Sequence, residues 1–209
     1  MNLDFQLLPE TNRYFPPVEL REASFVSGYV VPALSGRASG KICISGQCQD
    51  FSGVQAYHDH NWGVWRDVGW EWGSGSGGRL NLLYGGVYDS SSMASENSRS
   101  SAPFFFALVD SFGVKQVLRF SRVHYEGKQR AAGVLGVTAP KNFTVIAARD
   151  DDTVRLTVQV EDALSSEMAA RQFRRIFLQM RGRFTLAGRV TGQEVADTGM
   201  GFFETYIDK

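Results

Sequence analysis

The chain has 209 residues, which is enough for one large domain or two small ones with a sizeable core. Its 22 Lys and Arg residues equal its 22 Asp and Glu residues, and this balance argues against nucleic acid as a partner, because phosphate binding needs a basic surplus. The sequence shows neither the ~20 apolar residues of a membrane span nor the basic and apolar regions of a secretory signal. We therefore expect a cytoplasmic protein, with peripheral membrane association left open.

A hairpin is the first element that the sequence predicts, with strands at 41–45 and 47–51. If Ser45 and Gly46 form a two-residue turn, Cys43 and Cys48 face each other across the ladder. A disulfide is then geometrically feasible, although so short a loop adds little entropic stabilisation. We expect the reduced pair, because thiols of cytoplasmic proteins are kept reduced.

The segment 57–63, with the sequence YHDHNWG, concentrates proton-transfer and hydrogen-bonding groups. In an extended segment, side chains alternate between the two faces. One face then carries His58, His60 and Trp62, and the other carries Tyr57, Asp59, Asn61 and Gly63. The first face could line a pocket. Alternatively, the segment is a buried network of hydrogen-bonded polar side chains that holds neighbouring strands together. A metal is not expected, because His58 and His60 would need a third ligand such as His124.

Further strands follow to the end of the chain. Period-two patterns and turn signals predict them at 80–89, 103–110, 114–125, 143–149, 153–160, 184–191 and 201–207. The polar run 90–101 is expected to be an exposed loop. One short helix is expected near residues 165–171, leading into a strand.

Many strands, short turns and almost no helix predict an all-β fold. About nine strands follow Trp70, which is enough for one antiparallel lipocalin-like barrel. We expect this barrel to span 65–209. The N-terminal strands in 1–64 are then a remnant of, or a link to, a first barrel.

Three sequence runs carry a resemblance to a known family: YHDHNWG at 57–63, WEWG at 70–73 and GMGFFE at 199–204. Together they resemble the carotenoid 1,2-hydratases, also called hydroxyneurosporene synthases. That family belongs to a wider group of two-barrel, lipocalin-like proteins that includes terpenoid and polyketide cyclases. The resemblance is clear over about residues 28–90. Family members are usually longer, so this chain resembles their C-terminal part.

The resemblance implies roles for individual residues. The expected catalytic residues are His60, Trp62, Tyr84, Tyr88 and Asp89. The expected substrate-binding residues are His58, Trp70 and Trp72. Asp59 and Asn61 are expected to be structural, tying the segment to neighbouring backbone. Glu71 is expected to point outward between inward-facing Trp rings, and Glu204 to be structural.

The implied activity is acid-catalysed water addition to, or cyclisation of, a long apolar isoprenoid or polyene in a barrel cavity, which needs no cofactor. A generous aromatic load, with 15 Phe, 7 Tyr and 4 Trp residues, would either fill the core or line that cavity. Two alternatives are a cyclase that acts by shape and a non-catalytic domain for hydrophobic-ligand binding or assembly. Fold alone does not separate them.

We also expect association with another chain. If a first barrel is missing, apolar surface should be exposed around Phe5, Leu7, Tyr14, Phe15 and Tyr29. A homo-oligomer, or a partner chain that supplies the missing barrel, would cover it.

Overall fold

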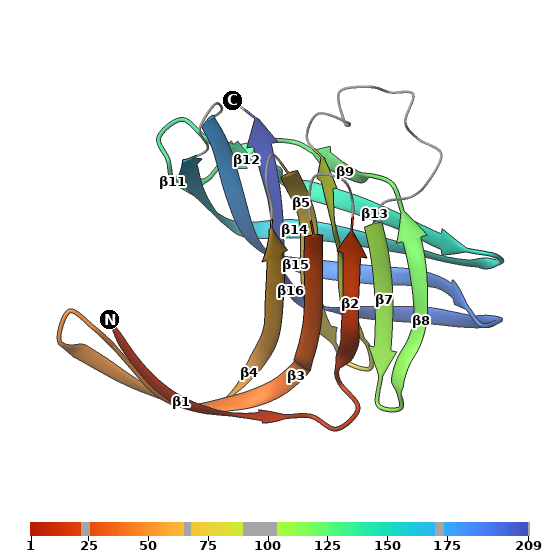
Figure 1. Cartoon of the computed structure of the whole chain (residues 1–209), viewed down its shortest axis with the longest axis horizontal. Helices are drawn as coiled ribbons and strands as arrows, with labels where there is room; N and C mark the ends of the chain where they lie inside the picture. Colours follow the sequence, from red (N-terminus) through yellow and green to blue (C-terminus); the bar gives the residue numbers. More distant parts are fainter. Residues whose placement is uncertain (22–25, 65–67, 90–103, 170–173, 209) are drawn as a thin grey trace.

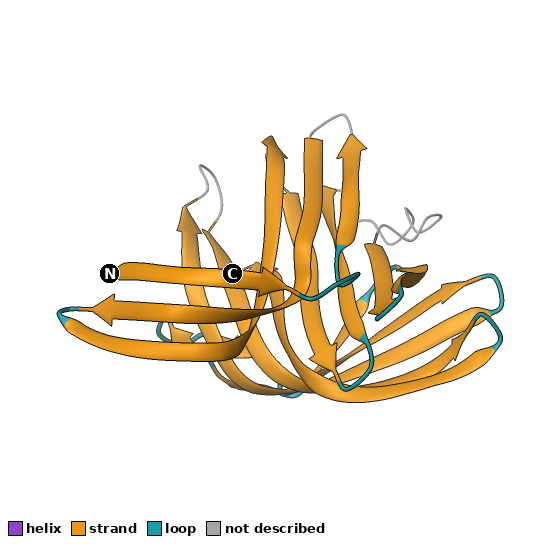
Figure 2. Ribbon diagram, turned by 90° about the horizontal axis from the view of Figure 1, so that it is seen from below, coloured by secondary structure: helices purple, strands orange, loops and turns teal. Residues whose placement is uncertain are grey.

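The computed structural model describes residues 1–21, 26–64, 68–89, 104–169 and 174–208, and these form two large β-sheets and one two-stranded sheet (Figures 1 and 2). The described residues contain strands and turns but no helix, as Figure 2 shows by colour. None of them therefore belongs to a helix long and apolar enough to cross a membrane.

The smaller sheet is N-terminal and is built around one long strand. Its strands are β1 (Asn2–Pro9), β2 (Phe15–Arg21), β3 (Val26–Ile44) and β4 (Gln47–Val64). β3 pairs with β4 along one edge, while β1 and β2 share its other edge. Register shifts between Val30 and Ala33, between Ala33 and Gly36, and between Ala38 and Gly40 interrupt the β3–β4 ladder. Such bulges bend strands, and the sheet curves accordingly in Figure 1.

The larger sheet closes into an eight-stranded antiparallel barrel. Its order is β14 (Asp152–Ala169), β15 (Arg174–Val190), β16 (Gln193–Asp208), β5 (Val68–Gly77), β6 (Asn81–Asp89), β7 (Phe104–Asp110), β8 (Gly113–Phe120) and β13 (Asn142–Arg149). β13 also pairs with β14, which closes the ring. The short strands β9 (Val123–Glu126) and β11 (Ala132–Gly133) pair with β13 and β14 beside the ring. β10 (Gln129–Arg130) and β12 (Thr138–Ala139) form a separate two-stranded sheet. The expectation of a lipocalin-like barrel with extra N-terminal strands is confirmed.

The prediction of a helix near residues 165–171 is wrong over the described residues of that segment. β14 continues to Ala169, and Ser165 pairs with Leu178 of β15. The segment contains residues that tolerate a helix, but the pairing with β15 overrides local propensity. Residues 170 and 171, and the polar run 90–101, lie outside the described residues.

Aromatic rings fill the middle of the barrel. Tyr84 stacks on Phe106 and on Phe203, with ring centroids 6.1 Å and 6.2 Å apart. Phe143 meets Phe203 edge to face at 5.0 Å. These side chains belong to one buried cluster that spans the barrel strands. The aromatic load therefore fills the core in this part of the barrel.

A second buried cluster joins the N-terminal sheet to the outside of the barrel. Phe15 and Tyr29 pack there with Leu83 and Val109. The expectation that Phe15 and Tyr29 belong to an exposed apolar surface is therefore wrong, because the barrel wall covers them. Arg13 adds a polar tie, since its guanidinium donates to the carbonyl of Val109 at 2.8 Å.

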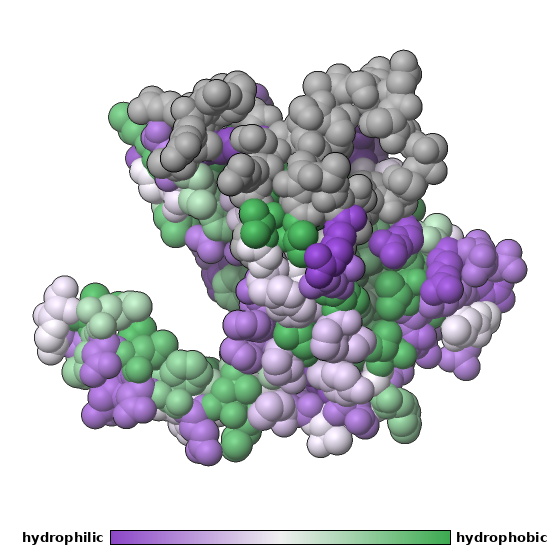
Figure 3. Space-filling model, viewed as in Figure 1, coloured by the Kyte–Doolittle hydropathy of each residue, from purple (hydrophilic) through white to green (hydrophobic). Residues whose placement is uncertain are grey.

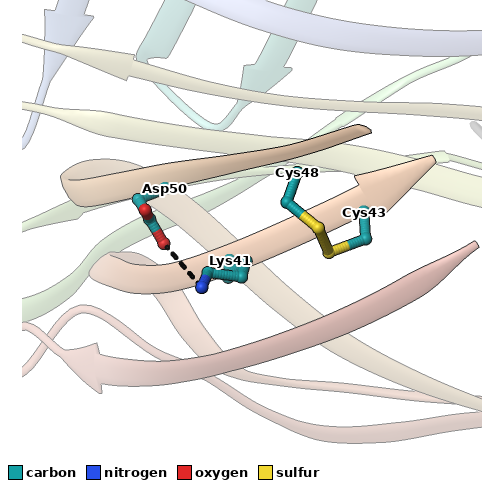
Figure 4. Close-up of a disulfide and its surroundings, with 4 residues drawn as sticks. All are labelled: Lys41, Cys43, Cys48 and Asp50. Atoms are coloured by element: carbon teal, nitrogen blue, oxygen red, sulfur yellow. Dashed lines mark ion pairs between the residues drawn. A yellow bond between two sulfur atoms is a disulfide. The ribbon is translucent and has the colours of Figure 1, made fainter. Parts of the chain in front are cut away.

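Cys43 and Cys48 form a disulfide near the end of the β3–β4 hairpin (Figure 4). The prediction that Cys43 and Cys48 are reduced is thus wrong in this structure. Ser45 and Gly46 both have positive φ, 51° and 85°, as a tight hairpin turn requires. The turn places the two cysteines directly opposite each other.

Asp197 holds the connection between β5 and β6. Its carboxylate accepts hydrogen bonds from the backbone N–H groups of Gly78 at 3.0 Å, Arg79 at 2.8 Å and Leu80 at 2.7 Å. Burial opposes the charge, but these donors outweigh it and lower the pKa of Asp197. One side chain from β16 therefore fixes the entry into β6.

We expect Asp197→Ala to lower the free energy of unfolding by about 2 kcal/mol, because four backbone donors, the three above and the N–H of Thr198, lose their acceptor. Denaturant unfolding of the purified protein measures this. Asp50→Ala is the matched control: its exposed ion pair with Lys41, 3.6 Å long, should contribute less than about 1 kcal/mol. Equal losses in both variants would contradict the role given to Asp197.

Candidate functional site

The segment 57–63 lies in β4 and alternates between faces as expected. His58, His60 and Trp62 lie on the face of the N-terminal sheet that is turned away from the barrel, and all three are exposed. The Trp62 ring covers Gly28 and its indole N–H donates to Glu19 at 3.2 Å. These three side chains therefore do not enter the barrel.

The opposite face of β4 contacts the barrel through a chain of hydrogen bonds. The Tyr57 hydroxyl donates to Asp59 at 2.9 Å and is hydrogen-bonded to the Tyr29 hydroxyl. The indole N–H of Trp72, on the barrel, donates to Tyr29 at 2.8 Å. Burial raises the pKa of both tyrosines, so both stay neutral. Asp59 is thus an acceptor at the end of this series of hydrogen bonds, whereas Asn61 is exposed.

Strand β5 has the opposite orientation to the one expected for the WEWG run. Glu71 points into the barrel, and Trp70 and Trp72 point outward, so the expectation of inward Trp rings is wrong. The reason lies in neighbouring glycines: a Cβ on Gly73 would meet the buried Tyr84 ring, so the Gly73 face is the inner one. Residues two apart share a face, which puts Glu71 inside.

Outside the barrel, Trp70 forms a half-buried cluster. Its ring packs edge to face on Phe177 and Tyr206, at 5.6 Å and 4.5 Å. Its indole N–H donates to Glu204 at 3.3 Å. Burial raises the pKa of Glu204, and the negative charge of Asp59 adds to the increase. Trp70 and Glu204 thus belong to the outer wall.

Inside the barrel, Glu71 is a buried acid held by two hydroxyl groups. It is 8% exposed. Tyr125 donates to one carboxylate oxygen at 2.7 Å, and Thr205 donates to the other at 3.0 Å. Burial raises the pKa of Glu71 to about 7, although both hydrogen bonds act against the increase. A carboxyl with this pKa can release or accept a proton near neutral pH.

The Glu71 site lies at one end of the barrel. Tyr125 is 38% exposed although its hydroxyl reaches the buried carboxyl, so its ring forms part of the rim. Tyr88 packs on Phe104 at 5.8 Å and against Gly69. The ring of Tyr84 lies deeper in the core.

The structure therefore separates the expected site residues into groups. Tyr84 and Tyr88 belong to the barrel interior near Glu71, whereas His58, His60 and Trp62 belong to the far face of the N-terminal sheet. The side chain of Asp89 lies outside the described residues. Glu71 and Tyr125 are not among the site residues that the sequence predicts. The alternation Gly69-Glu71-Gly73 was the available signal, because small residues on a strand face leave room for facing rings.

In the described ranges, no group of three or more His, Cys, Asp and Glu side chains is placed to hold a metal ion. The polar groups described around Glu71 at the barrel end are its carboxyl and the Tyr125 and Thr205 hydroxyl groups.

Comparisons with known proteins support the fold. No family model matches the chain, and no curated protein matches it. Among solved structures, CghA in complex with Sch210972 has a TM-score of 0.57 at 9% identity, covering 87% of this chain and 54% of CghA. An AttH-like protein from Nitrosomonas europaea has a TM-score of 0.56 at 18% identity, covering 97% of this chain and 61% of that protein.

A third structure, kievitone hydratase from Nectria haematococca, has a TM-score of 0.49 at 12% identity, covering 96% of this chain and 68% of that protein. The chain thus spans little more than half of CghA and of the AttH-like protein. Fold and site together define its class: an all-β, lipocalin-like barrel protein with a buried carboxyl at one barrel end.

We expect Asp59→Ala to lower the free energy of unfolding by about 1–3 kcal/mol, because the buried Tyr57 hydroxyl loses its acceptor. His60→Ala, two residues away on the exposed face, should change it by less than about 0.5 kcal/mol. Chemical denaturation of both variants measures the difference. Equal small effects would contradict the structural role of Asp59.

The buried acid also predicts a pH dependence of stability. The pKa of Glu71 is raised from 4.5 to about 7 on folding, so the folded state binds the proton more tightly. Stability is therefore full below about pH 4.5 and falls as the pH rises towards about 7, by about 3 kcal/mol in total. Glu71→Gln should remove this loss. Unfolding at mildly acidic and mildly alkaline pH tests it; parallel pH profiles would argue against a raised pKa.

Proposed function

We propose that the chain is a hydratase- or cyclase-like protein that acts on a long apolar isoprenoid or polyene by acid catalysis. The observation that carries the proposal is Glu71, a buried carboxyl with a pKa of about 7 at the barrel end. The lipocalin-like fold that the chain shares with CghA supports ligand binding, since that structure contains Sch210972. The family resemblance of the YHDHNWG run suggests the substrate class.

The chemistry needs a proton donor beside aromatic walls. Protonated Glu71 transfers its proton to one carbon of a substrate double bond, and the positive charge forms at the other carbon. Aromatic faces stabilise cations. Phe143 packs on Tyr125 with ring centroids 5.6 Å apart, and Phe203 packs on Phe143 at 5.0 Å. In hydration, a water molecule adds to the cation and its proton returns to Glu71. In cyclisation, a second double bond attacks the cation instead, and the new cation loses a proton from a neighbouring carbon to the Glu71 carboxylate, which forms a double bond and restores the acid.

Two hydroxyl groups position Glu71. Tyr125 and Thr205 orient the two carboxylate oxygens from different strands, β9 and β16. Both donate, so they stabilise the ionised carboxylate that remains after proton transfer. We place Tyr84 and Tyr88 in the wall of this site and keep Asp89 as a catalytic candidate.

A filled core limits how far a substrate can enter. Tyr84, Phe106 and Phe203 occupy the middle of the barrel, so only the end of a long chain would reach Glu71. An open groove of about 620 Å³ beside β14 and β15 is lined in part by Glu161, Asp162 and Arg181, which suit an apolar ligand poorly. The filled core is the observation that favours the alternative, a non-catalytic binding or assembly domain.

Incubation with acyclic carotenoids and short terpenols, read by mass spectrometry for a gain of water or for an isomer of unchanged mass, tests the proposal. We expect conversion by the wild type and a loss of about 100-fold or more in Glu71→Gln, which cannot donate the proton. Glu204→Gln is the matched control, because it removes a nearby carboxyl from the outer wall and should keep the activity.

The same assay distinguishes the alternatives. Activity that is unchanged in Glu71→Gln would rule out this acid, and activity that vanishes in His60→Ala would move the site to the N-terminal sheet. An inert wild type that still binds the polyene would favour a binding domain. An inert wild type that binds none would favour an assembly domain.

A further inference from the structure

The N-terminal sheet has an amphipathic arm. We define the arm as residues 2–9, 36–44 and 47–56, where β1, β3 and β4 run side by side away from the barrel (Figure 1). Directly paired residues lie on the same face. Three cross-strand rows lie on one face: Leu3–Ile42–Gln49, Phe5–Gly40–Phe51 and Leu7–Ala38–Val54. This face carries no charged side chain.

The opposite face of the arm collects the charges. Asp4, Arg37, Lys41 and Asp50 alternate with the apolar residues and point the other way. Yet Phe5 on the apolar face is 50% exposed, and Leu3 and Val54 are exposed as well. Figure 3 shows hydrophobic residues along the side of the arm that faces the hollow beside the barrel, and hydrophilic residues along the other side. An apolar sheet face of this kind is normally covered.

The apolar face continues into the exposed part of the YHDHNWG segment. β4 alternates without an extra residue from Val54 to Trp62, because the register shifts in this stretch add residues to β3 instead. Val54, His58, His60 and Trp62 therefore share one face. The sheet thus presents one continuous surface on this side, apolar at the arm and polar–aromatic at the other end.

We propose that this surface is covered by the same surface of a second copy of the chain, with His58, His60 and Trp62 inside the contact between the two sheets. The proposal is independent of the chemistry proposed for Glu71. Self-association suits the charge pattern: the arm face carries no charge, and at the other end Glu19, which accepts from the Trp62 indole, is neutralised by its ion pair with Arg21.

The size of the surface also fits a dimer. β4 has 18 residues. Three strands about 4.8 Å apart, with about 3.3 Å per residue along this length, present about 850 Å². A standard stable interface buries about 800 Å² on each partner. The arm face alone would cover only about half of that, so the contact must extend to the His58–Trp62 end.

Sedimentation velocity over a wide range of protein concentrations tests the proposal. We expect a wild-type dimer, and for Phe5→Glu a dissociation constant raised at least about tenfold, because a charge would be buried in the interface. Leu8→Glu is the matched control: it lies on the same strand, is 61% exposed and faces the other way, so it should leave the dimer intact. Circular dichroism and melting curves confirm that both variants fold.

Three outcomes would overturn the proposal. The first is a wild type that stays monomeric at every concentration. The second is a dimer that Leu8→Glu weakens as much as Phe5→Glu. The third is a monomer whose amides at residues 3–7 are protected from hydrogen exchange, since this would show that another segment covers the face. Exchange at residues 3–7 that slows only as the protein concentration rises supports the dimer.

Discussion

Strand β5 is the element on which both halves of the structure depend. Its period-two geometry sends Glu71 into the barrel and Trp70 and Trp72 out of it. Inside, burial raises the pKa of the Glu71 carboxyl into the neutral range. Outside, Trp72 ties the barrel to the hydrogen-bonded pair Tyr29 and Tyr57. A register slip of one residue would reverse both sets of side chains, so proton chemistry and sheet docking rest on the same strand.

Local periodicity was enough to predict the fold class. The alternation within 57–63 and the hairpin at Ser45 and Gly46 depend on neighbouring residues only, and both are confirmed. Contacts between distant residues were not predictable in this way. β14 continues through Ser165 because it pairs with β15, and the barrel closes because Phe143 and its strand pair with β14. Neither pairing can be predicted from the sequence of one strand alone.

The candidate site shows the same limit. Alternation predicts that Glu71 points to the other face of the strand from Trp70 and Trp72, but it does not say which face is the barrel interior. That depends on the rings supplied by other strands, here Tyr84 against Gly73. Similarly, the family resemblance grouped His60 with Tyr84, and the structure places them on different sheets.

Infrared difference spectroscopy of the carboxyl band tests the central claim most directly. Subtracting the spectrum of Glu71→Gln from that of the wild type isolates the Glu71 carboxyl. The account predicts a protonated carboxyl that titrates with a pKa of about 7, and a higher pKa in Tyr125→Phe, because the Tyr125 hydroxyl favours the ionised form. A Glu71 carboxyl that titrates near its ordinary pKa of 4.5, unchanged in Tyr125→Phe, would contradict the account.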